Sequence, residues 1–166
     1  MNDSASGSIP DLVQQLADKL LAKKLIIATA ESCTGGWIAQ SLTALAGSSN
    51  WFDSGFITYS NDAKQRMLNV PASLFEFGGP SAVSEETVLA MTQGALDNSC
   101  ANVAVAVSGV AGPGGGSEEK PVGTVWIAWQ WEDKVLVRCF QFSGDREAVR
   151  LATVAAALQG TLALLG

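Results

Sequence analysis

The chain of 166 residues contains no histidine. A serine or cysteine nucleophile that a histidine activates is therefore excluded, and so is any metal site with a histidine ligand. Hydrolytic chemistry would have to use a lysine, a carboxylate, the single tyrosine or a thiolate to move protons. The restriction extends to a homo-oligomer, because every copy would lack histidine as well.

Positive charge and cysteine are also scarce. Ten Lys and Arg residues stand against sixteen Asp and Glu, which gives a net charge of −6. We therefore expect no nucleic-acid partner, although a local pocket can still bind a small anion. The three cysteines (Cys33, Cys100 and Cys139) are an odd number without metal-ligand spacing. They indicate free thiols in a reducing compartment, and we expect a cytoplasmic protein.

Long hydrophobic runs and targeting signals are the next absences. We find no apolar run long enough to span a bilayer, and we expect no membrane partner. The first eight residues are small and polar, unlike a secretory signal. We expect a disordered tail over residues 1–9, with Ser8 as a possible helix cap, and one domain over residues 10–166.

Helical patterns and apolar strands alternate along the chain. The strands are expected at residues 25–30, 51–60, 103–107, 124–131 and 134–142, the last two as a hairpin. This order predicts an α/β fold, a three-layer α/β/α sandwich around a mixed, mostly parallel sheet. A final helix over about residues 146–165 is apolar nearly all round, which is typical of a core helix or of a homodimer interface.

The octet Thr29-Ala30-Glu31-Ser32-Cys33-Thr34-Gly35-Gly36 joins the first strand to a helix. It is interpreted either as an ordinary capped turn or as a backbone cradle for an oxyanion or a phosphate. Ser32 and Cys33 are adjacent rivals for the nucleophile. A thiol at a helix N-terminus can have a lowered pKa, whereas most free cysteines are small buried hydrophobes.

Without histidine, a serine with a lysine base is the favoured arrangement. The base needs a pKa below the usual value of about 10.4. Lys64 is the first candidate because it follows a strand end, and Lys120 is the second. Tyr59 is either a core aromatic or a hydrogen-bonding partner of Lys64. Arg146, at the start of the last helix, suits a phosphate or carboxylate, or else pairs with a neighbouring acid.

Residues 108–116 contain five glycines, an unusual concentration for an ordered loop. A flexible linker and a backbone that approaches a ligand closely are both compatible with this composition. The apolar strands on either side favour the ligand. We therefore expect Gly109, Gly112 and Gly115 to contribute to substrate binding.

Several segments together resemble the CinA C-terminal domain family. The resemblance spans about residues 10–163, and the matching segments are residues 29–36, 58–64, 82–84, 108–115, 120–125 and 142–146. It implies a stand-alone nicotinamide mononucleotide deamidase of NAD recycling, with no metal and no cofactor. It also implies that Ser32 is the nucleophile, Lys64 the base, Tyr59 a neighbour of that pair and Arg146 a site residue.

The mechanism expected from this resemblance is amide hydrolysis through an acyl-enzyme. Backbone N–H groups of residues 33–35, including those of Thr34 and Gly35, would hold the oxyanion together with the Ser49 hydroxyl. The glycine loop and Arg146 would hold the ribose and phosphate. Two alternatives stay open: a nucleotide-binding module without turnover, and a hydrolase of another small amide.

Overall fold

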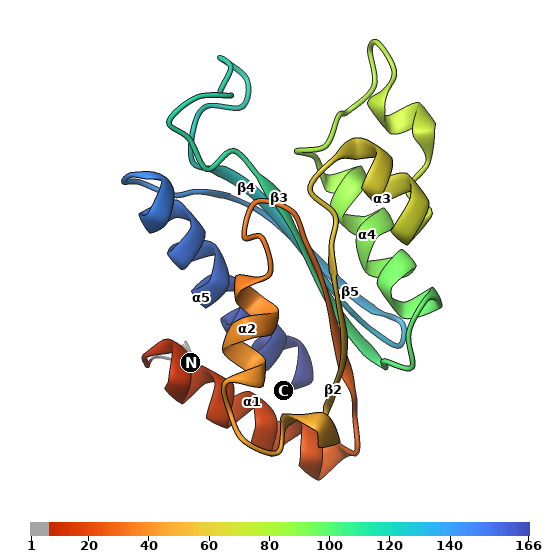
Figure 1. The fold of residues 1–166 in the computed structure, drawn as a ribbon, viewed down its shortest axis with the longest axis vertical. Helices are drawn as coiled ribbons and strands as arrows, with labels where there is room; N and C mark the ends of the chain where they lie inside the picture. The colour runs from red at the N-terminus through yellow and green to blue at the C-terminus, as the bar shows by residue number, and fades with distance from the viewer. Residues whose placement is uncertain (1–6) are drawn as a thin grey trace.

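The computed structural model describes residues 7–166 and contains one five-stranded sheet between two layers of helices (Figure 1). The strand order is β2-β1-β3-β4-β5, and the strands are β1 (Ile27–Glu31), β2 (Phe52–Ile57), β3 (Val103–Gly109), β4 (Thr124–Trp131) and β5 (Lys134–Gln141). β1 pairs in parallel with β2 and β3, and β4 runs antiparallel to β3 and β5. Only β4 opposes the others in this sheet, so the predicted α/β sandwich with a mixed, mostly parallel sheet is confirmed.

The two helical layers bury separate faces of the sheet. One layer holds α1 (Ile9–Lys23), α2 (Trp37–Thr43) and α5 (Arg146–Leu165), and the other holds α3 (Asn61–Leu68) and α4 (Glu85–Asp97). Short 3-10 helices lie at Ser48–Asn50 and Ala72–Phe75. Each layer has its own apolar cluster, centred on Leu16 and Leu158 in the first and on Val88 and Met91 in the second.

The start of α1 shortens the expected tail. The Ser8 hydroxyl accepts the Asp11 N–H, and the Asp11 carboxylate accepts the Ser8 N–H, which is a complete capping box. Ser8 and Ile9 therefore belong to the helix and its cap. Of the rest of the expected tail, residues 1–6 lie outside the described residues.

The last helix corrects one expectation. With 20 residues and only three charges at its N-terminal end, α5 is by length and composition apolar enough to cross a bilayer. In the fold it packs against β3, β4 and α1 instead. The Trp129 indole N–H donates to the Ala157 carbonyl at 2.9 Å, in the middle of this contact. The apolar surface of α5 is thus largely used in the core of its own chain.

The parallel strands bring three segments of the chain to one edge of the sheet. The Ser32 N–H donates to the Val107 carbonyl on β3, and the Thr58 N–H donates to the Glu31 carbonyl on β1. The segments that follow β1, β2 and β3 therefore start side by side. This is the edge at which ligands bind in open α/β sheets.

Candidate active site

Ser32 and Lys64 meet at this edge although they are 32 residues apart. The Lys64 Nζ donates to the Ser32 Oγ at 2.9 Å and to the Thr58 carbonyl at 2.7 Å, with the Tyr59 carbonyl at 3.4 Å. The Lys64 side chain is 1% exposed and Ser32 is 8% exposed. An amine and a hydroxyl thus lie within proton-transfer reach in a nearly dry environment.

Burial changes the acid–base properties of the two groups closest to Ser32. It lowers the pKa of Lys64 from 10.5 to about 8, because the charged ammonium is less well solvated there. It raises the pKa of the Cys33 thiol to about 11, and the nearby Glu31 carboxylate adds to that rise. Lys64 can therefore be a neutral base near neutral pH, whereas Cys33 stays a protonated thiol. This contrast favours Ser32 over Cys33 as the nucleophile.

Glu31 organises the turn that carries Ser32. Its buried carboxylate accepts the Thr34 hydroxyl at 2.6 Å and the N–H groups of Ile38 and Ala39 at 2.9 and 3.0 Å. The N-terminal N–H groups of α2 are thus satisfied within the chain. The interpretation of this helix end as a phosphate cradle is not supported, and the Thr34 side chain is turned to Glu31.

Arg146 joins two other loops of the same edge. Its Nη1 donates to the Gly112 carbonyl at 2.7 Å, and its Nη2 donates to the Tyr59 hydroxyl at 3.1 Å. Tyr59 is 64% exposed, so its ring is not a core aromatic. The structure thus brings Tyr59, Gly112 and Arg146 together from the segments that follow β2 and β3 and from the start of α5.

Comparison with known proteins places this arrangement in a family. The sequence model of the CinA C-terminal domain matches residues 10–165. The chain belongs to the CinA C-terminal domain family. It is 54% identical over 156 residues to a protein of Pseudomonas putida named nicotinamide-nucleotide amidohydrolase PncC, covering 94% of this chain and 96% of the relative. The PncC protein of Escherichia coli K12 is 49% identical over 160 residues, covering 96% and 94%.

Solved structures of CinA proteins share the fold. The competence/damage inducible protein CihA from Agrobacterium tumefaciens is 46% identical with a TM-score of 0.90, covering 96% of each chain. A CinA superfamily protein from Klebsiella pneumoniae is 38% identical with a TM-score of 0.91, covering 96% of this chain and 98% of that one. These likenesses extend over nearly the whole CinA domain described here.

The glycine loop of this CinA domain has a structural explanation at all three expected site positions. A Cβ on Gly109 would lie 2.8 Å from the Thr124 carbonyl oxygen, so β4 requires a glycine there. Gly112 has a φ of +84°, and a Cβ there would lie 2.5 Å from Val122. A Cβ on Gly115 would meet only Val110, at 3.8 Å, but Gly115 has a φ of +85°, a conformation that favours glycine. The packing of the loop on its own chain thus accounts for Gly109 and Gly112 without a ligand.

Two expected residues do not lie beside Ser32 and Lys64. Ser49 lies in the 3-10 helix just before β2, and β2 begins beside Ile27 at the amino end of β1. Ser32 follows the opposite end of β1, so Ser49 is separated from it by the length of the sheet. Lys120 instead donates to the Pro80 carbonyl and the Ser81 hydroxyl, at 2.7 and 2.9 Å. Lys64 is therefore the lysine that meets Ser32.

Two residues that hold the turn at Ser32 were not identified from the sequence. Glu31 was part of the octet but had no role assigned, and Arg150 was not singled out. The Arg150 guanidinium donates to the Cys33 and Thr34 carbonyls, both at 3.1 Å. The available signal was the spacing of Arg146 and Arg150, which places both arginines on one face of the last helix.

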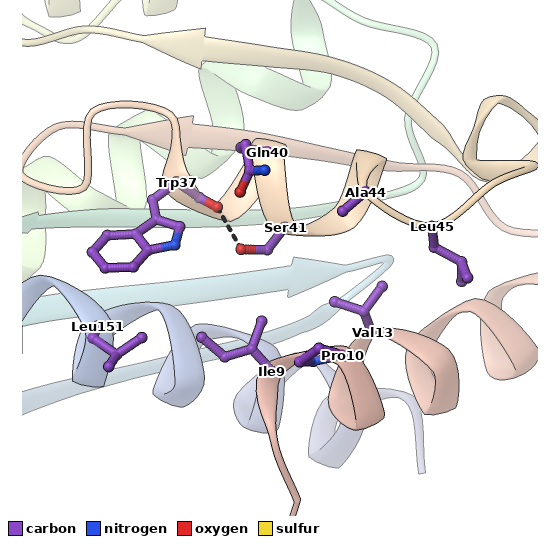
Figure 2. A pocket seen from close by; sticks show the side chains of 9 residues that line it. All are labelled: Ile9, Pro10, Val13, Trp37, Gln40, Ser41, Ala44, Leu45 and Leu151. Atoms are coloured by element: carbon purple, nitrogen blue, oxygen red, sulfur yellow. Dashed lines mark hydrogen bonds between the residues drawn. The ribbon is translucent and has the colours of Figure 1, made fainter.

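A separate apolar cavity of about 440 Å³ lies between α1, α2 and α5 (Figure 2). Its lining residues are Ile9, Pro10, Val13, Trp37, Gln40, Ser41, Ala44, Leu45 and Leu151. Neither Ser32 nor Lys64 contributes to it. Within residues 7–166, no three His, Cys, Asp or Glu side chains are grouped so that they could hold a metal ion.

Proposed function

We propose that this protein hydrolyses the carboxamide of nicotinamide mononucleotide, producing nicotinate mononucleotide and ammonia. The observation that carries the proposal is the 2.9 Å hydrogen bond between the Lys64 Nζ and the Ser32 Oγ, in a setting where burial lowers the pKa of Lys64 to about 8. The substrate is suggested by the relatives named nicotinamide-nucleotide amidohydrolase PncC.

The reaction begins when neutral Lys64 takes the proton of the Ser32 hydroxyl. The Ser32 Oγ then forms a bond to the carboxamide carbon, and the carbonyl oxygen becomes an oxyanion. Protonated Lys64 next donates its proton to the departing nitrogen, the C–N bond breaks, and ammonia leaves an ester on Ser32. Lys64 then removes a proton from a water molecule that attacks this ester, and it returns the proton to the Ser32 oxygen as the carboxylic acid product leaves. The product then loses its proton to solvent and becomes the carboxylate.

Binding of the nucleotide part is assigned to Arg146 and the loops that it joins. The Arg146 guanidinium is the cation best placed at this edge to meet a phosphate, since its two bonded partners come from the glycine loop and from Tyr59. Gly115, whose Cβ position has only Val110 within 4 Å, supplies backbone for close approach. Tyr59 would act through its contact with Arg146 and alongside Lys64.

An ammonia-release assay with three substrates tests the proposal. We expect turnover of nicotinamide mononucleotide and little or none of nicotinamide riboside or free nicotinamide, because both lack the phosphate. Tight binding of the mononucleotide without ammonia would indicate a binding module instead. Turnover of another small amide in its place would indicate a different amidase.

The matched pair Ser32→Ala and Cys33→Ala tests the identity of the nucleophile. Ser32→Ala should abolish turnover with the fold intact, whereas Cys33→Ala should retain most of it, because burial keeps the thiol protonated. The opposite result would transfer the role to the thiol. Mass spectrometry of the protein mixed with substrate and quenched should detect the acyl group on the peptide that contains Ser32.

Three further assignments belong to this proposal: a cytoplasmic location, a place in NAD recycling and a homodimer. The first two follow from the free thiols and from the expected product. The homodimer stays a prediction, because the apolar surface of α5 that suggested it also packs on the sheet of its own chain. Sedimentation equilibrium of the purified protein tests it.

A further inference from the structure

Arg150 connects the last helix to the turn that carries the nucleophile. Its Nε donates to the Cys33 carbonyl and its Nη2 donates to the Thr34 carbonyl, both at 3.1 Å. Its guanidinium also lies over the Trp37 ring, 5.4 Å from the ring centre. These three contacts fix the Arg150 side chain between Trp37 and the turn. Thr34 lies 116 residues earlier in the sequence than Arg150.

The direction of these contacts decides where the N–H groups of the turn point. Arg150 belongs to the helical layer of α1, α2 and α5, whereas Lys64 belongs to α3 in the opposite layer (Figure 1). The peptide bond between Cys33 and Thr34 is trans, so its N–H points away from its carbonyl. Because Arg150 holds the carbonyl on the α5 side, the Thr34 N–H points toward the side of Lys64 and the Ser32 Oγ.

The Thr34 N–H is also a free donor. The Gly35 N–H is already used, since it donates to the Ser32 carbonyl at 3.0 Å. Within residues 7–166, the Thr34 N–H donates to no acceptor. A charge-assisted hydrogen bond to the carbonyl of the same peptide unit further polarises this N–H. A fixed, polarised and unused donor beside a nucleophile has the properties of an oxyanion-hole group.

We propose that Arg150 is a positioning residue, which aims the Thr34 N–H at the oxyanion formed when Ser32 attacks the substrate. The inference rests on the proposed function and makes it more specific. It singles out one N–H among those of residues 33–35. The Cys33 N–H also donates to no acceptor in the described chain, but only the Thr34 N–H belongs to the peptide unit whose carbonyl Arg150 holds. The inference thus assigns to α5 the task of holding that donor. Arg146, one turn earlier on α5, holds the two other loops, so a single helix positions all three segments of the site.

The test compares Arg150→Ala, Arg150→Lys and the matched control Arg138→Ala, an exposed arginine on β5. With nicotinamide mononucleotide, Arg150→Ala should lower kcat about tenfold to hundredfold, because a misaimed oxyanion donor loses part of the about 10²–10³-fold that such a donor contributes. KM should change less than about threefold, since Arg150 makes no contact with bound substrate in this mechanism. Arg138→Ala should change neither value.

Rescue separates a positioning role from a general structural one. Methylguanidinium added to Arg150→Ala should restore part of kcat, because it can occupy the space between the two carbonyls, and it should have no such effect on Arg138→Ala. The pH at which kcat/KM levels off should stay near 8 in Arg150→Ala, since Lys64 lies in the other layer. If Arg150→Ala does not fold, the Arg150→Lys variant is the test of the positioning role. The kcat of Arg150→Lys should fall about fivefold or more, because one ammonium cannot replace the two guanidinium nitrogens that bind the two carbonyls.

The outcomes distinguish this inference from the proposed function. If Ser32→Ala is inactive but the folded Arg150 variants keep wild-type kcat, the role of Arg150 is refuted and the proposed function stands. A fall in kcat that methylguanidinium does not rescue, or a rise in KM with unchanged kcat, also refutes the positioning role. If the wild-type protein releases no ammonia from the mononucleotide, both fail together.

Discussion

Replacement of Lys64 by methionine should stabilise the protein at neutral pH while it abolishes turnover. The Lys64 ammonium is almost completely buried, and its pKa falls from 10.5 to about 8. Each pKa unit corresponds to about 1.4 kcal/mol, so the charged side chain destabilises the native state by about 3 kcal/mol at pH 7. Loss of the hydrogen bonds to Thr58 and Ser32 offsets about 1–2 kcal/mol of this gain. Lys64→Met should therefore be about 1–2 kcal/mol more stable than wild type at pH 7.

The pH dependence gives this prediction its signature. Between pH 8 and 10.5 the native chain has lost the Lys64 proton while the unfolded chain still binds it, so the stability of the wild type rises with pH. The advantage of Lys64→Met should shrink over this window and reverse near its upper end. The raised pKa of Cys33 makes stability fall between pH 9 and 11 in both chains. Because the Lys64 charge lowers the pKa of Cys33, this contribution cancels only in part above pH 9, and the comparison from pH 7 to 9 is the one that reports on Lys64.

Urea denaturation at pH 7, 8, 9 and 10 measures the effect. Lys23→Met is the control, because Lys23 is exposed at the end of α1 and its ammonium lies over the Trp131 ring, 5.4 Å from the ring centre. Its replacement should change stability by no more than about 1 kcal/mol at any of these pH values. A difference between Lys64→Met and wild type that stays constant from pH 7 to 10 would refute the reasoning. Lys64 would then not be a buried amine of low pKa, and the neutral base of the mechanism would be lost.

Three further predictions concern the same edge of the sheet. The value of kcat/KM should rise with pH and level off above about 8 as Lys64 loses its proton; a pH–rate profile checks this, and a plateau already reached at pH 6 contradicts it. Glu31→Gln should lower the free energy of unfolding by about 2 kcal/mol, because one acceptor oxygen of Glu31 is replaced by an NH₂ group that faces an N–H of α2. Urea denaturation measures this change, and unchanged stability would show that the helix end does not need the carboxylate. Tyr59→Phe should lower kcat/KM by about tenfold to hundredfold, the value of one hydrogen bond from the charged Arg146 guanidinium. Steady-state kinetics with the mononucleotide measures it, and a loss of about 10³-fold in kcat would instead make the Tyr59 hydroxyl a proton relay.

The element order was predictable because local patterns determine it. Apolar runs at residues 25–30 and 103–107 became β1 and β3, and Ser84 caps α4 as its spacing to the acidic first turn indicates. The final helix was predicted within one residue at each end. The sequence could not decide whether this helix packs in the core of its own chain or in a homodimer interface. An apolar surface can be buried equally well by either.

The residues of the site were only partly predictable, because their grouping depends on contacts between distant segments. Ser49 has the right chemistry, and only the parallel register of β1 and β2 shows that it lies at the wrong end of the sheet. Arg150 has an ordinary helical position in the sequence. Its contacts with the Cys33 and Thr34 carbonyls depend on how α5 packs in the folded chain.

By itself, the sequence determined the kind of chemistry available to this protein. A chain without histidine that carries Ser32 after an apolar strand can activate that serine with a lysine, and no folding event changes this composition. The tertiary structure decided which lysine meets Ser32. Lys64 and Lys120 are both candidates by position, but only Lys64 is buried against Ser32, and burial is what lowers its pKa. Solvation depends on the whole fold, so the sequence could name the reacting groups but not the proton affinity that makes one of them a base.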